Sequence, residues 1–246
     1  MKTLSVLSLI LSSTIGIAVL SATPDIAKAE TTTLEASAPL KVAELFTSQS
    51  CSSCPPAEAL FSDLAEREDL LTLEWHVDYW DTLIHGGSKW KDPYSDKAFT
   101  NRQRTYNQSL RGTRGVYTPQ AIVNGKTETV GNSRGKVSSL LKSATELPLS
   151  VDIKNNVVSV GANEAEVEVL FVRLLKQHKT DVKGGENKGR RLHGKNIVLE
   201  AVILGNTSAT PTQFDIPSVQ ANESCAVMVQ SLTNDLGPIL GAARCH

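Results

Sequence analysis

Apolar and polar positions follow two different rhythms along the first half of the chain. Short apolar runs indicate buried strands, whereas stretches with an apolar residue every three or four positions indicate helices. In chain order we expect a strand at 42–46, a helix at 57–68, a strand at 70–77, a helix at 94–110, a strand before an Asn-Gly turn at 124–125, a return strand at 126–130 and a helix from about 133 to 145. This β-α-β-α-β-β-α order predicts an α/β domain with a mixed sheet.

The pattern changes after Leu147 and Pro148. Five segments rich in β-branched residues follow, and no convincing helical period is found among them. They span 149–153, 157–160, 166–175, 195–204 and 225–232. We therefore expect two domains, an α/β domain at 30–147 and an all-β, sandwich-like domain at 148–246.

The first 29 residues have the features of a secretory signal peptide. Lys2 precedes an apolar segment at 4–20, and Ala27-Lys28-Ala29 fits the small-x-small cleavage pattern. We expect a periplasmic or secreted protein without stable membrane insertion after cleavage. The alternative is a retained membrane anchor, although serines and threonines interrupt the apolar segment. The formal net charge of −1 argues against general binding of nucleic acid.

The four cysteines form a close pair, Cys51 and Cys54, and a distant pair, Cys225 and Cys245. The close pair lies where a strand is followed by a helix. The dipole at the N-terminus of that helix favours a thiolate. We expect Cys54 to cap this helix, with Pro55 at its first position. If the pair is catalytic, a solvent-facing Cys51 attacks and Cys54 resolves the mixed disulfide. A permanent disulfide and metal binding remain open as alternatives.

Thr118 and Pro119 precede another strand, as in the segment with which thioredoxins and glutaredoxins bind substrates. We predict a cis Thr118–Pro119 bond whose backbone pairs with an extended peptide. Trp80 and Trp90 follow the second strand and would wall this peptide groove.

Asp78 and Asp81 in the same loop would transfer protons during exchange. Equally, the two tryptophans could be local core, and the two acids could be helix caps or partners of Lys89 and Lys91. His76 is expected to be a core histidine inside its strand.

Two thiolates and a histidine such as His85 would suit copper(I) or zinc. The sequence has no second Cys-x-x-Cys and no His-x₃-His. We therefore predict no metal and no organic cofactor.

Two basic segments have simple structural explanations. The Gly-rich stretch 176–195 is explained by a flexible hairpin connection, and docking to anionic lipid or to a partner is the alternative. The four arginines at 102, 104, 111 and 114 form either a solvated face or a basic rim for an anion.

Cys225 and Cys245 lie at equal distances from Asp235 along the chain. If 227–232 and 239–243 are the arms of a hairpin, the two thiols meet at its open end. We predict a structural disulfide there, and closing a loop of about 20 residues contributes about 3 kcal/mol.

Three segments resemble a family of exported bacterial proteins catalogued as domain of unknown function 1223. They are Phe-Thr-Ser-Gln-Ser-Cys-Ser-Ser-Cys-Pro-Pro at 46–56, His-Val-Asp-Tyr-Trp-Asp at 76–81 and Tyr-Thr-Pro-Gln at 117–120. Gly-Glu-Asn-Lys-Gly-Arg at 185–190 extends the resemblance into the second half. Since that family is assigned a thioredoxin-like fold, the resemblance implies this fold for the α/β domain. It implies no activity, because the family has no settled function.

The leading hypothesis is a thiol–disulfide oxidoreductase that acts through Cys51 and Cys54 on the thiols and disulfides of exported proteins, together with a redox partner. Two alternatives stay open. One is a binding or adaptor module with a structural Cys51–Cys54 disulfide, and the other is a copper or zinc chaperone.

Overall fold

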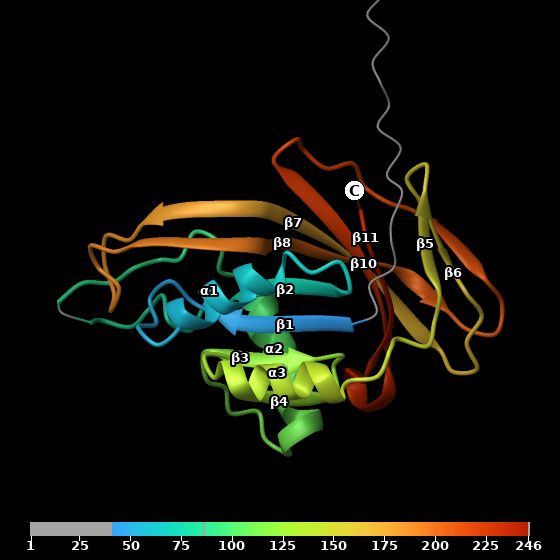
Figure 1. Ribbon diagram of the computed structural model, residues 1–246, viewed down its shortest axis with the longest axis horizontal. Helices are drawn as coiled ribbons and strands as arrows, with labels where there is room; N and C mark the ends of the chain where they lie inside the picture. Colours follow the sequence, from blue (N-terminus) through green and yellow to red (C-terminus); the bar gives the residue numbers. More distant parts are fainter. Residues whose placement is uncertain (1–40, 86, 246) are drawn as a thin grey trace, which may run out of the picture. The chain divides into compact units, whose positions relative to one another are not determined.

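The computed structural model describes residues 41–85 and 87–245, in which the first half follows the predicted order of elements (Figure 1). The expected signal peptide lies outside the described residues. The first-half elements are β1 (Lys41–Thr47), α1 (Pro55–Leu64), β2 (Leu70–His76), α2 (Lys97–Arg111), β3 (Gln120–Val123), β4 (Thr127–Val130) and α3 (Arg134–Ser143). None of the helices in the described ranges combines the length and the apolar character that a membrane crossing requires.

The second half is built from strands, as its β-branched pattern predicts. They are β5 (Val151–Lys154), β6 (Val157–Val160), β7 (Val167–Asp181), β8 (Arg191–Thr207), β9 (Thr212–Asp215), β10 (Glu223–Ser231) and β11 (Ile239–Arg244), with one 3-10 turn at Thr233–Asp235. Strands β5, β6 and β9 form a small antiparallel sheet. Its valines pack on the inner faces of β7 and β10, which gives this half a sandwich-like core.

One eight-stranded sheet runs through both halves, in the order β11-β10-β7-β8-β2-β1-β3-β4. Strands β1 and β2 are parallel. Strand β3 is antiparallel to β1, and β4 is antiparallel to β3. The two halves join where Glu74 of β2 pairs with Ile197 of β8. The expected boundary at Leu147 therefore falls between two parts of a shared sheet, and the molecule is a mixed α/β protein.

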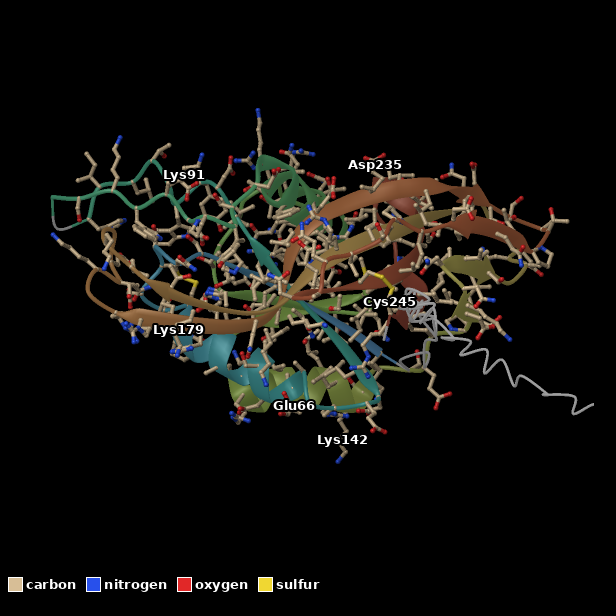
Figure 2. The ribbon with its side chains drawn as sticks, turned by 90° about the horizontal axis from the view of Figure 1, so that it is seen from above. Glu66, Lys91, Lys142, Lys179, Asp235 and Cys245 are labelled. Atoms are coloured by element: carbon tan, nitrogen blue, oxygen red, sulfur yellow. A yellow bond between two sulfur atoms is a disulfide. The ribbon has the colours of Figure 1, made fainter. Side chains whose placement is uncertain are left out.

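Side chains of β1 and β2 alternate between two covered faces of this sheet. Leu45 and Leu70 pack with α1 and α3, whereas Phe46 and Trp75 pack with α2. We call these the α1 face and the α2 face. Figure 2 shows them on opposite sides of the sheet, with Glu66 and Lys142 beyond the α1 face. Because both faces are covered, β1 and β2 are apolar along most of their length.

The predicted Cys225–Cys245 disulfide is present at the open end of the β10–β11 hairpin (Figure 2). The Cys245 amide donates to the Cys225 carbonyl, so the two residues are also paired through the backbone. The disulfide ties the last strand to the core between the two sheets.

Arg102 departs from the solvated face or basic rim expected of the four arginines. Its guanidinium points from α2 into the α2 face, where Nε lies 2.8 Å from Oε1 of the buried Glu44. The acid on β1 explains this inward orientation, because a buried carboxylate requires a charged partner.

Candidate functional site

The Cys51–Cys54 disulfide lies in the loop between β1 and α1, as predicted. The Cα atoms of the two cysteines are 5.4 Å apart, and the Cys54 amide donates to the Cys51 carbonyl. Cys54 is the N-cap of α1 and Pro55 is its first residue. This placement suits proline, because the first helical amide needs no intrahelical acceptor.

Cys51 is buried, with 0% of its surface exposed, and so is Cys54. The prediction of a solvent-facing Cys51 was therefore wrong. The cause is a segment from the second half of the chain that lies over the cysteine loop. We call this segment, residues 182–190 between β7 and β8, the covering loop.

The covering loop is fastened to the cysteine loop through side chains and backbone. The Asn187 amide group donates to the carbonyls of Gln49, at 3.0 Å, and Cys51, at 2.8 Å. The Glu186 carboxylate accepts a hydrogen bond of 2.8 Å from the Ser52 amide. These contacts correct the expectation of a flexible hairpin connection at 176–195, since this part of the connection is a packed cover.

Glycine is required in the covering loop because its backbone approaches other segments closely. A Cβ atom on Gly184 would collide with the Lys89 carbonyl. Gly185 has φ +68°, and a Cβ there would lie 3.0 Å from the Ser50 hydroxyl. Its glycines therefore serve close packing on the cysteine loop and not mobility.

The Thr118–Pro119 bond is cis, as predicted, and lies directly before β3. Gln120 pairs with Phe46 near the end of β1, which leads into the cysteine loop. A Cβ on Gly131 would lie within 3.5 Å of both Pro119 and Ala57, so the proline is close to the start of α1. The structure thus brings the cis bond to the same edge as the disulfide.

Both predicted tryptophans are tied to this edge by their ring N–H groups. Trp80 Nε1 donates to the Thr118 hydroxyl at 2.8 Å. Trp90 Nε1 donates to Gln49 Oε1 at 3.2 Å, and the Trp90 carbonyl accepts from the Ser50 hydroxyl. Trp80 therefore supports the proline segment, and Trp90 supports the cysteine loop.

The two acids predicted to transfer protons are bonded to hydroxyl groups. Asp78 accepts a hydrogen bond of 2.6 Å from the Thr100 hydroxyl, and Asp81 accepts one of 2.6 Å from the Ser95 hydroxyl. Burial raises the pKa of Asp81, which the Ser95 bond opposes. These hydrogen bonds favour the structural alternative, in which the two acids bind local partners. The partners are hydroxyl groups and not Lys89 and Lys91.

Glu58 is the acidic residue that sequence reasoning missed. It lies four residues after Cys54 on α1, is 1% exposed, and accepts a 2.7 Å hydrogen bond from the Thr47 hydroxyl. Burial raises the pKa of Glu58 to about 7, although a coulombic attraction to His76 opposes the shift. The signal in the sequence was a glutamate next to Ala57 and before Leu60 and Phe61, on the buried face of the helix.

His76 and Asp92 form a buried pair beside Glu58. His76 Nδ1 and Asp92 Oδ2 are 2.7 Å apart, and Asp92 also accepts from the Gln49 amide at 2.7 Å. Burial alone would lower the pKa of His76, but the Asp92 carboxylate raises it above its ordinary value. Burial would likewise raise the pKa of Asp92, and His76 together with backbone amides keeps it below its ordinary value. His76 is inside the core, as predicted, and the Gln49 contact connects it to the cysteine loop.

The fold and the site define a mixed α/β protein with a covered Cys-x-x-Cys disulfide above a cluster of buried ionisable groups. The chain belongs to the family described as protein of unknown function (DUF1223), whose model matches residues 42–230. A crystal structure of a protein from Agrobacterium tumefaciens, determined by a structural genomics consortium, is 30% identical. It matches 85% of this chain and 95% of its own, with a TM-score of 0.69. A search of curated proteins found no match.

Proposed function

We propose that the chain is a thioredoxin-like thiol–disulfide oxidoreductase that acts on exported proteins through Cys51 and Cys54. The order β2-β1-β3-β4, with the disulfide before α1 and the cis proline before β3, supports a thioredoxin-like core. The signal-peptide pattern of residues 1–29 supports a site of action in the periplasm or outside the cell.

The observation that carries the proposal is Glu58. A group with a pKa of about 7 exchanges protons readily near neutral pH, and Glu58 lies one helical turn from Cys54, on the same side of α1. A structural disulfide needs no such group. A buried acid with one unpartnered oxygen costs stability, and its place one helical turn from Cys54 therefore favours a chemical role.

The exchange proceeds in two balanced steps. A thiolate of the partner attacks Cys51 Sγ, a partner–Cys51 disulfide forms, and the Cys51–Cys54 bond breaks. Cys54 leaves as a thiolate and takes the proton of neutral Glu58. A second thiolate of the partner then attacks the partner sulfur of the mixed disulfide. The partner leaves as a disulfide and Cys51 as a thiolate, so two electrons pass to the protein.

Burial of Cys51 requires that the covering loop move before a partner can react. Asn187 and Glu186 make the hydrogen bonds that must break. A docking peptide that pairs with the backbone beside Pro119 could supply the energy for this displacement.

The same burial favours a second candidate function, a binding or adaptor module with a fixed disulfide. In that case Cys51–Cys54 only stiffens the loop between β1 and α1. The two candidates differ in whether Cys51 ever forms a bond to another protein.

Trapping of mixed disulfides in cells tests the proposal. In a Cys54→Ala variant, Cys51 cannot be released by its neighbour, so an exchange enzyme accumulates partners joined through Cys51. The matched control is the double variant Cys51→Ala/Cys54→Ala, which keeps the Cys225–Cys245 disulfide. Covalent partners that form in the single variant but not in the double variant support the proposal. Equal adducts in both variants, or none in either, favour the fixed disulfide.

A further inference from the structure

Three side chains on the α1 face converge on one point inside the protein. Glu74 and His76 extend from β2, and His178 extends from β7 across the intervening strand β8. All three residues are buried, with exposed fractions of 0%, 0% and 6%. One oxygen of Glu74 and one ring nitrogen of each histidine lie within 4.8 Å of one another.

The converging atoms have no hydrogen-bond partner in the part of the chain that the structure describes. These atoms are both carboxylate oxygens of Glu74, His76 Nε2 and His178 Nε2. Glu74 Oε2 and His76 Nε2 are 4.0 Å apart, which is too far for a hydrogen bond. Buried polar atoms without partners are rare and costly in native proteins, so such a group needs an explanation.

Gly194 of β8 leaves space for a small ligand between these atoms. A Cβ atom there would lie 2.5 Å from Glu74 Oε2 and 2.9 Å from His178 Nε2. The residue pairs with His178 in the β7–β8 register and has no positive φ, so its backbone does not require glycine. What the missing side chain provides is room beside the ligand atoms.

The other ring nitrogen of each histidine is held by a second group. Asp92 holds Nδ1 of His76 at 2.7 Å, and the Thr180 hydroxyl lies 3.0 Å from Nδ1 of His178. Orientation of histidine by a carboxylate or hydroxyl on the far side of the ring is the usual outer shell of a metal ligand. It leaves both Nε2 atoms directed at the carboxylate of Glu74.

We propose that Glu74, His76 and His178 bind one divalent transition-metal ion of the zinc class. Two imidazoles and one carboxylate suit Zn²⁺, whose bonds of about 2.0–2.2 Å place neighbouring ligand atoms about 3.4 Å apart in a tetrahedral site. The three ligand atoms lie within 4.8 Å of one another, so binding would draw them together by up to about 1.4 Å.

This site is separate from the thiol chemistry, because it uses neither Cys51 nor Cys54. Glu58 lines a surface depression of about 370 Å³ and interacts electrostatically with both Glu74 and His76.

The test is titration of the purified, oxidised protein with Zn²⁺, with the metal content after dialysis measured by mass spectrometry. Both disulfides remain closed, so no thiolate can compete for the ion. We expect one Zn²⁺ per chain in the wild type. His178→Gln should lose at least 100-fold in affinity, and Asp92→Asn, which removes outer-shell support, about 10–100-fold.

The matched control is His193→Gln, since His193 lies next to Gly194 on the same strand but is exposed. It should bind Zn²⁺ as the wild type does. Gly194→Ala keeps every ligand and fills the space between them, so it should fold and yet bind at least 10-fold more weakly. Circular dichroism of each variant checks that the fold is retained.

Three results would overturn the proposal. They are a wild type that binds no Zn²⁺ at micromolar concentration, folded His178→Gln and Gly194→Ala variants with unchanged affinity, and an equal loss in His193→Gln. The first result would indicate that Glu74 and the histidines share protons without a metal. Because the disulfide stays closed throughout, none of these results depends on whether Cys51 is trapped with partners.

Discussion

The two faces of the shared sheet each contain a buried group of polar side chains, and they differ in how these side chains are satisfied. On the α2 face, Glu44 accepts from Arg102 at 2.8 Å and from the Tyr106 hydroxyl at 2.6 Å. Gln230 accepts from Arg102 and donates to Tyr106 and to the Gly237 carbonyl. This network joins β1, α2 and β10 and leaves the Glu44 carboxylate fully paired.

On the α1 face, the polar groups remain incomplete. Glu58 has one oxygen without a partner, and Glu74 has two. His76 and His178 each have a ring nitrogen, Nε2, that has no hydrogen-bond partner among the described residues. The charges also differ, because Glu44 has a buried cation and Glu74 has none bonded to it.

This difference distinguishes buried polar side chains that stabilise the fold from buried polar side chains that are available for a function. A complete network fixes how α2 and β10 sit on the sheet, and its atoms have no capacity left for a ligand. An incomplete group costs stability, and proteins retain such groups mainly where protons, metals or substrates are handled. The helix that carries Glu58 on this face begins directly after the disulfide.

The largest effect is expected from Glu44→Gln on the α2 face. The substitution keeps the shape of the side chain but leaves the Arg102 charge without its partner, which costs about 3–5 kcal/mol in a buried pair. Urea unfolding measures this loss. Glu68→Gln, an exposed glutamate, serves as the control and should change stability by less than about 0.5 kcal/mol. A loss below about 1 kcal/mol for Glu44→Gln would contradict the structural role of the network.

The next effect is a pH dependence that comes from Glu58. Its folded pKa of about 7 exceeds the ordinary value of 4.5, so the folded state binds more protons between these values and stability falls as pH rises. The loss amounts to about 3 kcal/mol between pH 4.5 and 8, at about 1.4 kcal/mol per pKa unit. The free energy of unfolding, measured against pH, should fall more steeply for the wild type than for Glu58→Gln.

The two buried histidines also contribute to the pH dependence, and Glu58→Gln removes one of the charges that raise the pKa of His76. The raised pKa of His76 makes stability fall as pH rises, whereas the lowered pKa of His178, about 4, makes it increase between pH 4 and 6.5. The difference between the two proteins therefore reports Glu58 together with its coupling to His76. Parallel profiles for wild type and Glu58→Gln would show that Glu58 has no unusual pKa.

A smaller effect is expected from Asn187→Ala in the covering loop. The substitution removes the donors to the Gln49 and Cys51 carbonyls, and we expect a loss of about 2 kcal/mol. Reduction of Cys51–Cys54 by dithiothreitol should become at least 10-fold faster, because the cover opens more often. Lys188→Ala, exposed in the same loop, is the control for both measurements. Unchanged reduction rates would mean that Asn187 does not hold the cover closed.

The smallest effect is expected from Glu74→Gln, the same chemical change as Glu44→Gln on the opposite face. Burial raises the pKa of Glu74 above its ordinary value, and among the described residues no cation is bonded to Glu74 that the substitution would leave unpaired. A neutral amide in its place should change the free energy of unfolding by less than about 1 kcal/mol, measured in the presence of a chelator. A loss as large as that of Glu44→Gln would remove the contrast between the faces.

Local patterns were sufficient for the elements of the first half, for the start of α1 and for the Cys225–Cys245 disulfide. The apolar runs predicted β1 and β2, the proline after Cys54 predicted the start of α1, and hairpin symmetry predicted the Cys225–Cys245 disulfide. Each depends on residues that are neighbours in sequence or paired through one turn. Such features follow from backbone preferences that the sequence displays directly.

The features that the sequence did not reveal depend on contacts between distant segments. The pairing of Glu74 with Ile197 merges the two halves into one sheet, and nothing in either strand specifies that partner. The same pairing brings the covering loop over Cys51 and places His178 opposite Glu74. Cys51 was therefore expected to be exposed, and the metal alternative considered from the sequence used Cys51, Cys54 and His85, none of which belongs to the group of Glu74, His76 and His178.

The reduction potential of Cys51–Cys54 tests the central claim most directly. The oxidised protein is equilibrated with thiol–disulfide buffers of known potential, and a Cys225→Ala/Cys245→Ala variant isolates the signal of the close pair. An exchange enzyme should have a potential above about −300 mV, in the range of catalytic pairs. A potential below that value would contradict the proposed exchange and make the pair a structural bridge.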